Sequence, residues 1–217
     1  MRSLIISDLH MGDGTGTDDF IAQDDKVLNF IENINPDILY LNGDIFELWQ
    51  CSMRKIRKFH YTFTNYVEGK YYKPVIFPQI VKLKGNHDYS LLGQMKAEIT
   101  TRSGKKVLIT HGFQNDPLMT NPISRFFTWC LGRIERLIPN IDNVFSASKR
   151  INNKANEYAM QQLKKYDIVI LGHTHKIECK QYLVLGRFVT YANSGTCTNG
   201  KIQGILLDTD TDEIKIV

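Results

Sequence analysis

Five of the six histidines in this 217-residue chain lie in short polar clusters that end apolar runs. In chain order the clusters are Asp8-Leu9-His10, Gly43-Asp44, Gly85-Asn86-His87-Asp88, His111-Gly112 and Gly172-His173-Thr174-His175. Each follows a stretch typical of a β-strand, at residues 4–7, 38–41, 80–83, 107–110 and 168–171. Side chains just past the carboxyl ends of strands converge in open α/β sheets. The clusters therefore predict a site that the fold assembles from five distant segments.

The side chains in these clusters are of the kinds that bind divalent metal ions. The candidate ligands are Asp8, His10, Asp44, Asn86, His111, His173 and His175. They offer carboxylate, carboxamide and imidazole donors but no thiolate, which favours Mn²⁺, Fe or Zn²⁺ over Mg²⁺ and Ca²⁺. We expect two divalent ions, with Mn²⁺ favoured and Fe or Zn²⁺ as alternatives. A Gly-Asp or His-Gly pair alone is common turn material, so the prediction depends on the ordered series.

Length and composition favour one α/β domain. A chain of this length with 42% hydrophobic residues can bury a sizeable core. No apolar run approaches the roughly 20 residues that cross a bilayer, and Asp8 interrupts the apolar start too early for a signal peptide. We therefore expect a soluble, cytoplasmic protein. The four cysteines are far apart, which favours reduced packing thiols over a zinc ribbon or a disulfide framework.

The pattern outside the clusters alternates helices and strands. Apolar periodicity predicts helices at residues 21–34 and 54–69 and a hairpin at 99–111. Four more strands are expected near residues 181–185, 188–192, 202–208 and 213–217. The sixth histidine, His60, lies in a predicted helix and is assigned no role.

Residues 113–165 interrupt this rhythm with two predicted amphipathic helices. Their expected buried stripes are Ile123, Phe126, Phe127, Cys130, Ile134, Leu137 and Ile138, and then Ile151, Ala155, Tyr158, Ala159 and Leu163. The segment holds eight Lys/Arg against four Asp/Glu, whereas the rest of the chain has nineteen of each, so the whole excess of +4 lies here. A basic block suits phosphate, nucleic acid or an anionic lipid surface, and a solvated helix face explains it equally well.

This ordered series of clusters resembles the calcineurin-like metallophosphoesterase superfamily over nearly the whole chain. The resemblance implies an α/β fold, a four-layer α-β-β-α sandwich, as a single domain over residues 1–217 with a helical cap insertion at about 113–165. It implies that Asp8, His10 and His175 bind one metal, that Asn86, His111 and His173 bind the other, and that Asp44 bridges both. His87 would be the general acid or a cation that stabilises the developing charge, oriented by Asp88.

The resemblance implies a hydrolase in which a metal-bridging hydroxide attacks a phosphodiester or pyrophosphate bond. The stretch Gly43–Trp49 and the helical insertion look like the UDP-2,3-diacylglucosamine pyrophosphatase branch, which implies a UDP-linked or other lipid-related substrate. The expected substrate contacts are then Asn86, Arg125, Trp129 and Arg133, and the cap would offer peripheral contact with the inner membrane face. That branch has arginine where this chain has His87, so another pyrophosphate or phosphodiester stays open.

Two other functions stay open. A nucleotide phosphodiesterase or nuclease is the enzymatic alternative, although nucleic acid is the less favoured partner because the short chain has no room for an appended DNA-binding domain. A non-catalytic scaffold is the least favoured hypothesis, because every expected ligand and the expected acid are present.

Overall fold

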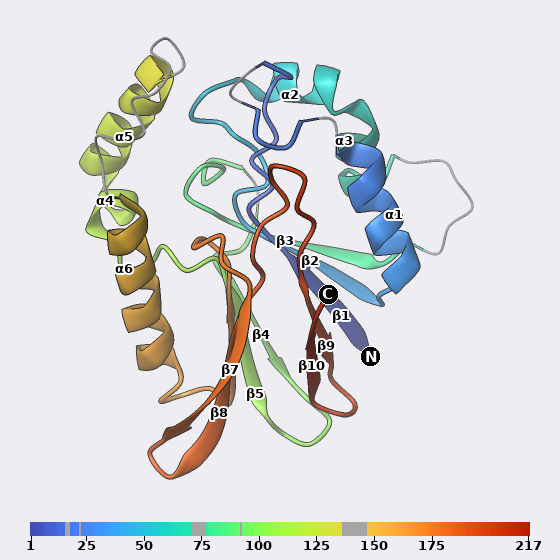
Figure 1. The fold of residues 1–217 in the computed structure, drawn as a ribbon, viewed down its shortest axis with the longest axis vertical. Helices are drawn as coiled ribbons and strands as arrows, with labels where there is room; N and C mark the ends of the chain where they lie inside the picture. The colour runs from blue at the N-terminus through green and yellow to red at the C-terminus, as the bar shows by residue number, and fades with distance from the viewer. Residues whose placement is uncertain (16–17, 22, 71–76, 92, 136–146) are drawn as a thin grey trace.

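Two five-stranded sheets form the centre of the protein (Figure 1). The first has the order β10-β9-β1-β2-β3 and the second has the order β4-β5-β6-β8-β7. The strands are β1 (Arg2–Ile6), β2 (Ile38–Asn42), β3 (Gln79–Leu83), β4 (Lys96–Thr100), β5 (Lys106–Thr110), β6 (Ile168–Leu171), β7 (Glu178–Val184), β8 (Arg187–Asn193), β9 (Ile205–Asp208) and β10 (Glu213–Ile216). This computed structural model describes all residues except 16–17, 22, 71–76, 92 and 136–146, together with the side chains of 128, 131–135 and 147–149.

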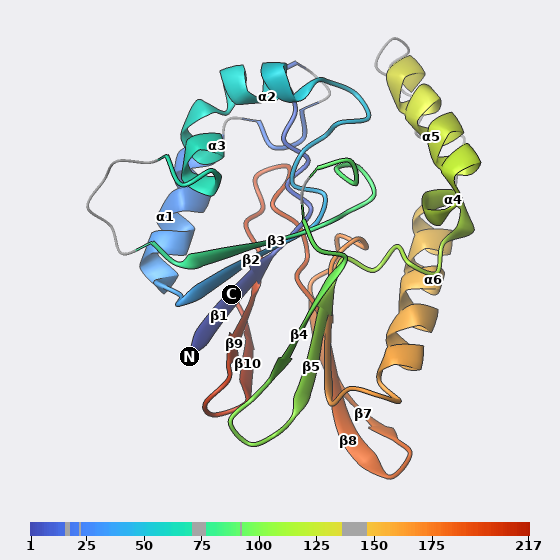
Figure 2. The same cartoon turned by 180° about the vertical axis from the view of Figure 1, so that it is seen from behind.

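Helices cover the outer face of each sheet, as two views of the ribbon show (Figures 1 and 2). The helices are α1 (Asp24–Ile34), α2 (Met53–Phe59), α3 (Tyr61–Val67), α4 (Pro117–Thr120), α5 (Pro122–Glu135) and α6 (Ala147–Gln162). Helices α1 to α3 pack on the first sheet, and α6 packs on the second. The predicted α/β class and α-β-β-α layering are thereby confirmed.

The central strands are buried on both faces, which explains why the sequence shows continuous apolar runs before the polar clusters. In β1, Leu4 and Ile6 join the core under the helices, whereas Ile5 joins the core between the sheets. In β6, Ile170 faces the other sheet and Val169 faces α6. Successive side chains alternate between two apolar layers, so these strands lie in the centre of the molecule and their polar ends come out at one edge.

The helix predicted at residues 54–69 is two helices, because the chain breaks at His60. The backbone of His60 is not helical (φ −99°, ψ 50°), and its ring is completely buried. Its Nε2 lies 2.9 Å from Asp18 Oδ2 and its Nδ1 lies 2.7 Å from Asp24 Oδ2. Both ring nitrogens face carboxylates, which only accept, so the imidazole carries both protons. This ion triad ties α2 and α3 to α1 and to the loop before it.

The two helices expected to form a cap have different environments. In α6, Ala155, Ala159 and Leu163 are buried, and Ala159 and Leu163 pack on the second sheet, so α6 belongs to the outer helical layer. The buried stripe predicted for α5 is wrong at Ile123, Phe126 and Phe127, which are 69%, 59% and 63% exposed. The reason is that α5 extends beyond the sheet toward the edge where the ligand loops gather, so no sheet surface covers it (Figure 2).

The stripe residues Leu137 and Ile138 and the side chain of Ile134 lie outside the described residues. No helix in the described part of the chain is both long and apolar enough to cross a bilayer.

The buried His60 triad predicts a specific pH dependence of stability. Burial lowers the pKa of His60, but Asp18 and Asp24 raise it to about 9. The folded pKa exceeds the ordinary value of 6.5, so the stabilisation is complete below about pH 6.5 and is lost as the pH rises through about 9. This linkage corresponds to about 3 kcal/mol.

Urea unfolding of the wild type and of His60→Gln at pH 6 and pH 9.5 measures the effect. The wild type is expected to lose about 3 kcal/mol more on alkalisation than the variant does. Asp24→Asn removes the more accessible of the two carboxylates. Its loss of stability on alkalisation is expected to lie between that of the wild type and that of His60→Gln. Equal pH dependence in all three proteins would contradict the assignment of His60 as a buried cation.

Candidate metal centre

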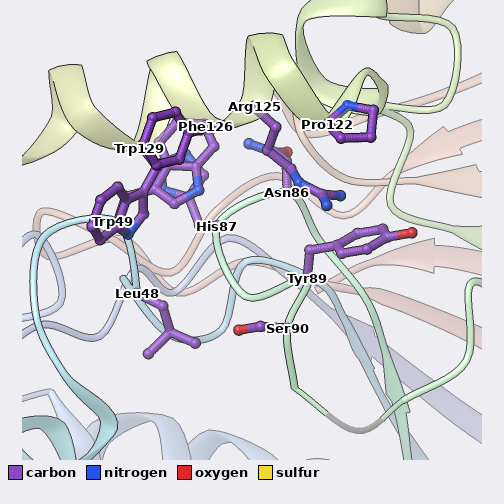
Figure 3. Close-up of a pocket in the computed structure, with 10 residues that line it drawn as sticks. All are labelled: Leu48, Trp49, Asn86, His87, Tyr89, Ser90, Pro122, Arg125, Phe126 and Trp129. Carbon is purple, nitrogen blue, oxygen red and sulfur yellow. The ribbon is translucent and has the colours of Figure 1, made fainter.

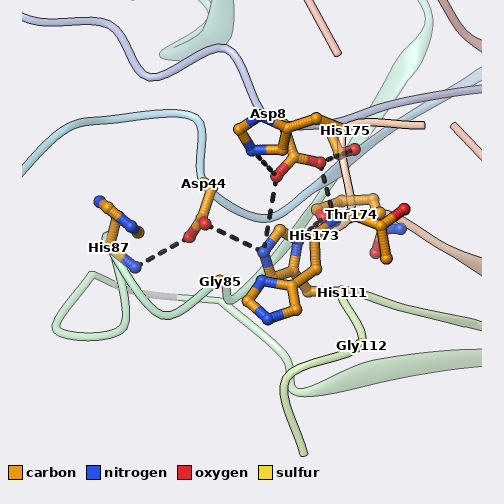
Figure 4. A network of polar contacts seen from close by, with 12 residues as sticks. Asp8, Asp44, Gly85, His87, His111, Gly112, His173, Thr174 and His175 are labelled. Carbon is orange, nitrogen blue, oxygen red and sulfur yellow. Dashed lines mark hydrogen bonds and ion pairs between the residues drawn. The ribbon is translucent and has the colours of Figure 1, made fainter. Parts of the chain in front are cut away.

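The predicted ligands follow strands that end at one edge of the sandwich, and Figure 4 shows Asp8, Asp44, His111, His173 and His175 gathered there. Asp8 and His10 follow β1, Asp44 follows β2, Asn86 follows β3, His111 follows β5, and His173 and His175 follow β6. His175 Nε2 lies 3.2 Å from Asp8 Oδ1 and 3.2 Å from His10 Nε2. His111 Nε2 lies 3.0 Å from Asp44 Oδ2. The fold thus brings ligands from both sheets together.

The ligand atoms fall into two neighbouring groups. In one group, atoms of Asp8, His10 and His175 all lie within 4.8 Å of one another, and in the other the same holds for Asp44, His111 and His173. Asp44 lies between the groups, because its Oδ2 is 3.0 Å from His111 Nε2 and 3.9 Å from His10 Nε2. The arrangement suits two ions with Asp44 between them. A further such group among the described residues joins His10 and Asp44 to His87.

Two buried atoms at the site, Asn86 Oδ1 and His173 Nε2, have no hydrogen-bond partner among the described residues. Asp8 Oδ1 and His111 Nε2 make no hydrogen bond either, but each lies close to another ligand, His175 at 3.2 Å and Asp44 at 3.0 Å. His111 Nδ1 donates to the backbone carbonyl of Asn42 at 2.7 Å, which directs Nε2 toward the other ligands. A buried polar atom without a partner costs about 1–3 kcal/mol. These atoms are all of kinds that bind metals, and they fit a pair of divalent ions.

Asp8 and Asp44 are held as carboxylates and His173 as a neutral imidazole, which are the forms that metal binding needs, whereas His111 is held protonated. Burial raises the pKa of Asp8, but His111 and His175 lower it to about 2, and neighbouring histidines keep the pKa of Asp44 well below its ordinary value. Burial lowers the pKa of His173 to about 3, so this ring is neutral. Burial also lowers the pKa of His111, but Asp44 and Asp8 raise it to about 10. Metal binding is therefore expected to release the His111 proton.

The backbone at the ligands is strained. Asp8, His10, Asp44, His173 and His175 all have positive φ, between 47° and 68°. The left-handed region costs about 1–2 kcal/mol for a residue with a side chain, and such residues concentrate where function requires an exact geometry. Hydrogen bonds hold two of these turns, since His173 N donates to Asp8 Oδ2 at 2.9 Å and His87 N donates to Asp44 Oδ1 at 2.8 Å.

Two glycines permit the close approach of the ligand loops. A Cβ at Gly85 would lie 2.1 Å from Asp44 Oδ1 and 2.2 Å from Asp44 N. A Cβ at Gly172 would lie 2.4 Å from Ser7 Oγ and 2.8 Å from Asp8 Oδ2. These distances are far shorter than any real contact of a Cβ atom. The glycines that precede Asn86 and His173 are therefore required, because each lies directly against a neighbouring loop that carries a ligand carboxylate.

The carboxylate beside His87 is Glu47, not Asp88. Glu47 Oε2 lies 2.7 Å from His87 Nδ1 and 2.9 Å from His10 Nδ1, and its side chain is almost fully buried. Asp88, which we expected to orient His87, accepts hydrogen bonds from the backbone amides of Gly85 at 2.9 Å and Ile45 at 2.8 Å. It therefore holds the loops after β2 and β3 together. One carboxylate, Glu47, positions both the ligand His10 and His87.

Burial and charge act in opposite directions at this pair. Burial raises the pKa of Glu47, but His87 and His10 lower it to about 2. Burial lowers the pKa of His87, but Glu47 and Asp44 raise it to about 9. The indole of Trp49 also stacks on the His87 ring, with the centroids 3.7 Å apart and the planes inclined by 21°. These contacts favour the protonated form of His87.

A cleft of about 380 Å³ opens beside His87, between α5 and two ligand loops (Figure 3). Three of the four expected substrate contacts, Asn86, Arg125 and Trp129, line it. The fourth, Arg133, has its side chain outside the described residues.

The sequence did not reveal Glu47 as the partner of His87 or Tyr89 as a cleft residue. The one available signal for Glu47 was its place within Gly43–Trp49, three residues after Asp44.

Comparison with known proteins identifies the family and the fold of the chain. Residues 1–212 match the family model for the calcineurin-like phosphoesterase superfamily domain. No protein of curated function matches the sequence. Wild-type Vps29 from Entamoeba histolytica, complexed with Zn²⁺, aligns over 100% of this chain and 90% of its own, with a TM-score of 0.52 and 20% identity. Hypothetical protein PH1004 from Pyrococcus horikoshii OT3 covers 100% and 86%, with a TM-score of 0.52 and 9% identity. At these identities the two structures show the fold alone.

The position of Glu47 predicts an effect on metal binding. Glu47→Gln keeps the shape of the side chain but removes the charge that orients His10 through Nδ1. Loss of such a supporting carboxylate typically weakens metal binding about 10–100-fold. Isothermal titration with Mn²⁺ is expected to show a loss of this size. Glu68→Gln, at a surface residue paired with Arg57, is the matched control and is expected to bind as the wild type does. Equal affinity in both variants would contradict the role of Glu47.

Proposed function

The chain belongs to the calcineurin-like phosphoesterase superfamily, and from this premise we propose that it is a dinuclear metal-dependent hydrolase of phosphodiester or pyrophosphate bonds. The observation that carries the proposal is the two neighbouring groups of carboxylates and imidazoles, most of them buried, with Asp44 between the groups. Mn²⁺ is the favoured ion, because the donors are carboxylate, carboxamide and imidazole.

The residues of the chain have distinct parts in this proposal. When bound, two divalent ions supply an activated water and neutralise the phosphoryl oxygens. Asp8, His10 and His175 would hold one ion and Asn86, His111 and His173 the other, and Asp44 lies where it could serve both groups.

His87 is proposed as the general acid for the leaving oxygen. Glu47 faces its Nδ1, which leaves Nε2 as the proton donor. The His87 ring lines the cleft and is grouped with the ligands His10 and Asp44, which places it next to the phosphoryl group that the ions would hold. General acid catalysis is worth about 10²–10⁴ in rate. Asp88 braces the loop that carries His87, and its charge also helps to raise the pKa of His87, after burial and the stronger effects of Glu47 and Asp44.

The favoured finer proposal is a UDP-linked or other lipid-related substrate. Support comes from exposed apolar side chains on α4 and α5, such as Leu118 and Ile123, beside the cleft residues Arg125 and Trp129. Apolar and cationic groups together suit an amphipathic substrate and contact with the inner membrane face from the cytoplasm. A nucleotide phosphodiesterase is the alternative, favoured by the aromatic lining of the cleft. A non-catalytic scaffold would not need the proton donor and the ligand set together.

Hydrolysis of bis-p-nitrophenyl phosphate with and without Mn²⁺ tests the class. Asp44→Asn is expected to abolish turnover and to lower the number of bound Mn²⁺ ions, because Asp44 contacts both ligand groups. His87→Ala is expected to keep Mn²⁺ binding and to lower kcat about 10²–10⁴-fold. Asp25→Asn, on the exposed face of α1, is the control and is expected to act as the wild type does. Absence of Mn²⁺-dependent turnover in the wild type would refute the proposal.

A substrate panel tests the finer proposal. The Mn²⁺-loaded protein is incubated with UDP-2,3-diacylglucosamine, dinucleoside polyphosphates and cyclic nucleotides, and the products are identified by mass spectrometry. Release of UMP from the first substrate is the expected result for the lipid branch. Turnover confined to the nucleotides would assign the protein to the alternative.

A further inference from the structure

The cleft beside His87 has aromatic walls on two sides. Helix α5 contributes Phe126 and Trp129 to one side, and the loops after β2 and β3 contribute Trp49 and Tyr89 to the other (Figure 3). His87 itself lies at the inner end, next to the metal ligands. The cleft is therefore continuous with the site at which the proposed hydrolysis would occur.

The rings in the cleft are held close to parallel in pairs. Phe126 and Trp129 are one helical turn apart on α5, with centroids 6.0 Å apart and planes inclined by 25°. Trp49 stacks on His87, as described above. Leu48 and Pro122 are the aliphatic members of the lining among the described residues. Flat, preorganised aromatic faces suit another flat ring, whereas flexible chains are usually packed by aliphatic side chains.

The cation Arg125 lies in the same cleft. The Arg125 guanidinium lies over the Tyr89 ring, 4.1 Å from its centroid. None of the acidic side chains in the described part of the chain forms an ion pair with Arg125. A planar guanidinium that is held on an aromatic face is suited to bind phosphate oxygens in a fixed geometry. The cleft therefore offers stacking surfaces and an anion contact within one cavity.

We propose that this cleft is a stacking subsite for a planar ring, a nucleobase or an aryl group, joined to the phosphoryl group of the substrate. This inference rests on the proposed function and specifies its substrate class. Phe126, Trp129 and Trp49 determine specificity, and Arg125 contacts a phosphate oxygen. The volume of 380 Å³ is near the lower end of the roughly 300–1,000 Å³ of ligand pockets, which suits one nucleoside better than two acyl chains.

Tryptophan fluorescence tests the subsite without turnover, because the chain has two tryptophans and both line the cleft. Thymidine 5′-monophosphate is expected to quench the emission saturably in the presence of Mn²⁺, and 2-deoxyribose 5-phosphate, which lacks the base, is expected to bind more weakly. Loss of one stacking ring is expected to reduce the affinity about 5- to 150-fold. Phe126→Leu removes such a ring and leaves both tryptophans as reporters.

Phe127→Leu is the matched control. Phe127 is the next residue on α5 and is similarly exposed, but it does not line the cleft. Its affinity for thymidine 5′-monophosphate is expected to equal that of the wild type. Equal binding of the nucleotide and the base-free phosphate, or equal effects of Phe126→Leu and Phe127→Leu, would overturn the proposal.

A kinetic comparison separates the subsite from the hydrolase activity. Three substrates share a p-nitrophenyl phosphate group and differ in the second ester: thymidine 5′, methyl and n-octyl. The wild type is expected to have the highest kcat/KM for the thymidine ester, and Phe126→Leu is expected to lose most of this preference while it still cleaves the methyl ester. Highest kcat/KM for the octyl ester would overturn the stacking subsite in favour of a lipid groove. No turnover of any ester, with base-dependent quenching retained, would refute the hydrolase and support the subsite.

Discussion

The metal centre depends on the way in which the pairing of β1 with β2 continues beyond the strands. Asp8 N donates to Gly43 O at 3.1 Å, His10 N donates to Asp44 O at 3.0 Å, and Met11 N donates to Ile45 O at 3.0 Å. These bonds hold two turns with positive φ side by side, so that Asp8, His10 and Asp44 point into one space. The histidines that follow strands of the second sheet complete this site, whose shape is set by the loops of the first sheet.

Electrostatics explains why the site is built from alternating carboxylates and imidazoles. Asp8, Asp44 and Glu47 are almost completely buried, and an isolated buried carboxylate would be strongly destabilising. His111, His87 and His10 lie at short distances from these groups and offset their charge. Protons on the histidines take the place that divalent ions are proposed to fill. The same groups would thus balance charge without metal and bind metal when it is present.

The strands and the ligand set were predictable because their signals are local. Apolar runs buried on both faces predicted the central strands to within one or two residues, and the polar clusters marked where they end. The break at His60 was not predictable, because it depends on Asp18 and Asp24, which are distant in sequence. The exposure of Phe126 was also not predictable, since an amphipathic pattern indicates an apolar face but not what covers it.

The sequence by itself determined the α/β class, the seven candidate ligands and their order, because these follow from residue type and from where the apolar runs end, and the sandwich was implied by the resemblance to the family. Only the tertiary structure decided which carboxylate faces His87. Asp88 is adjacent to His87 in sequence, but its side chain accepts hydrogen bonds from backbone amides. Glu47, in the loop after β2, contacts the His87 ring instead. It also decided that α5 lines a cleft while α6 covers a sheet. Contacts between distant segments depend on three-dimensional packing, which periodicity in a sequence does not encode.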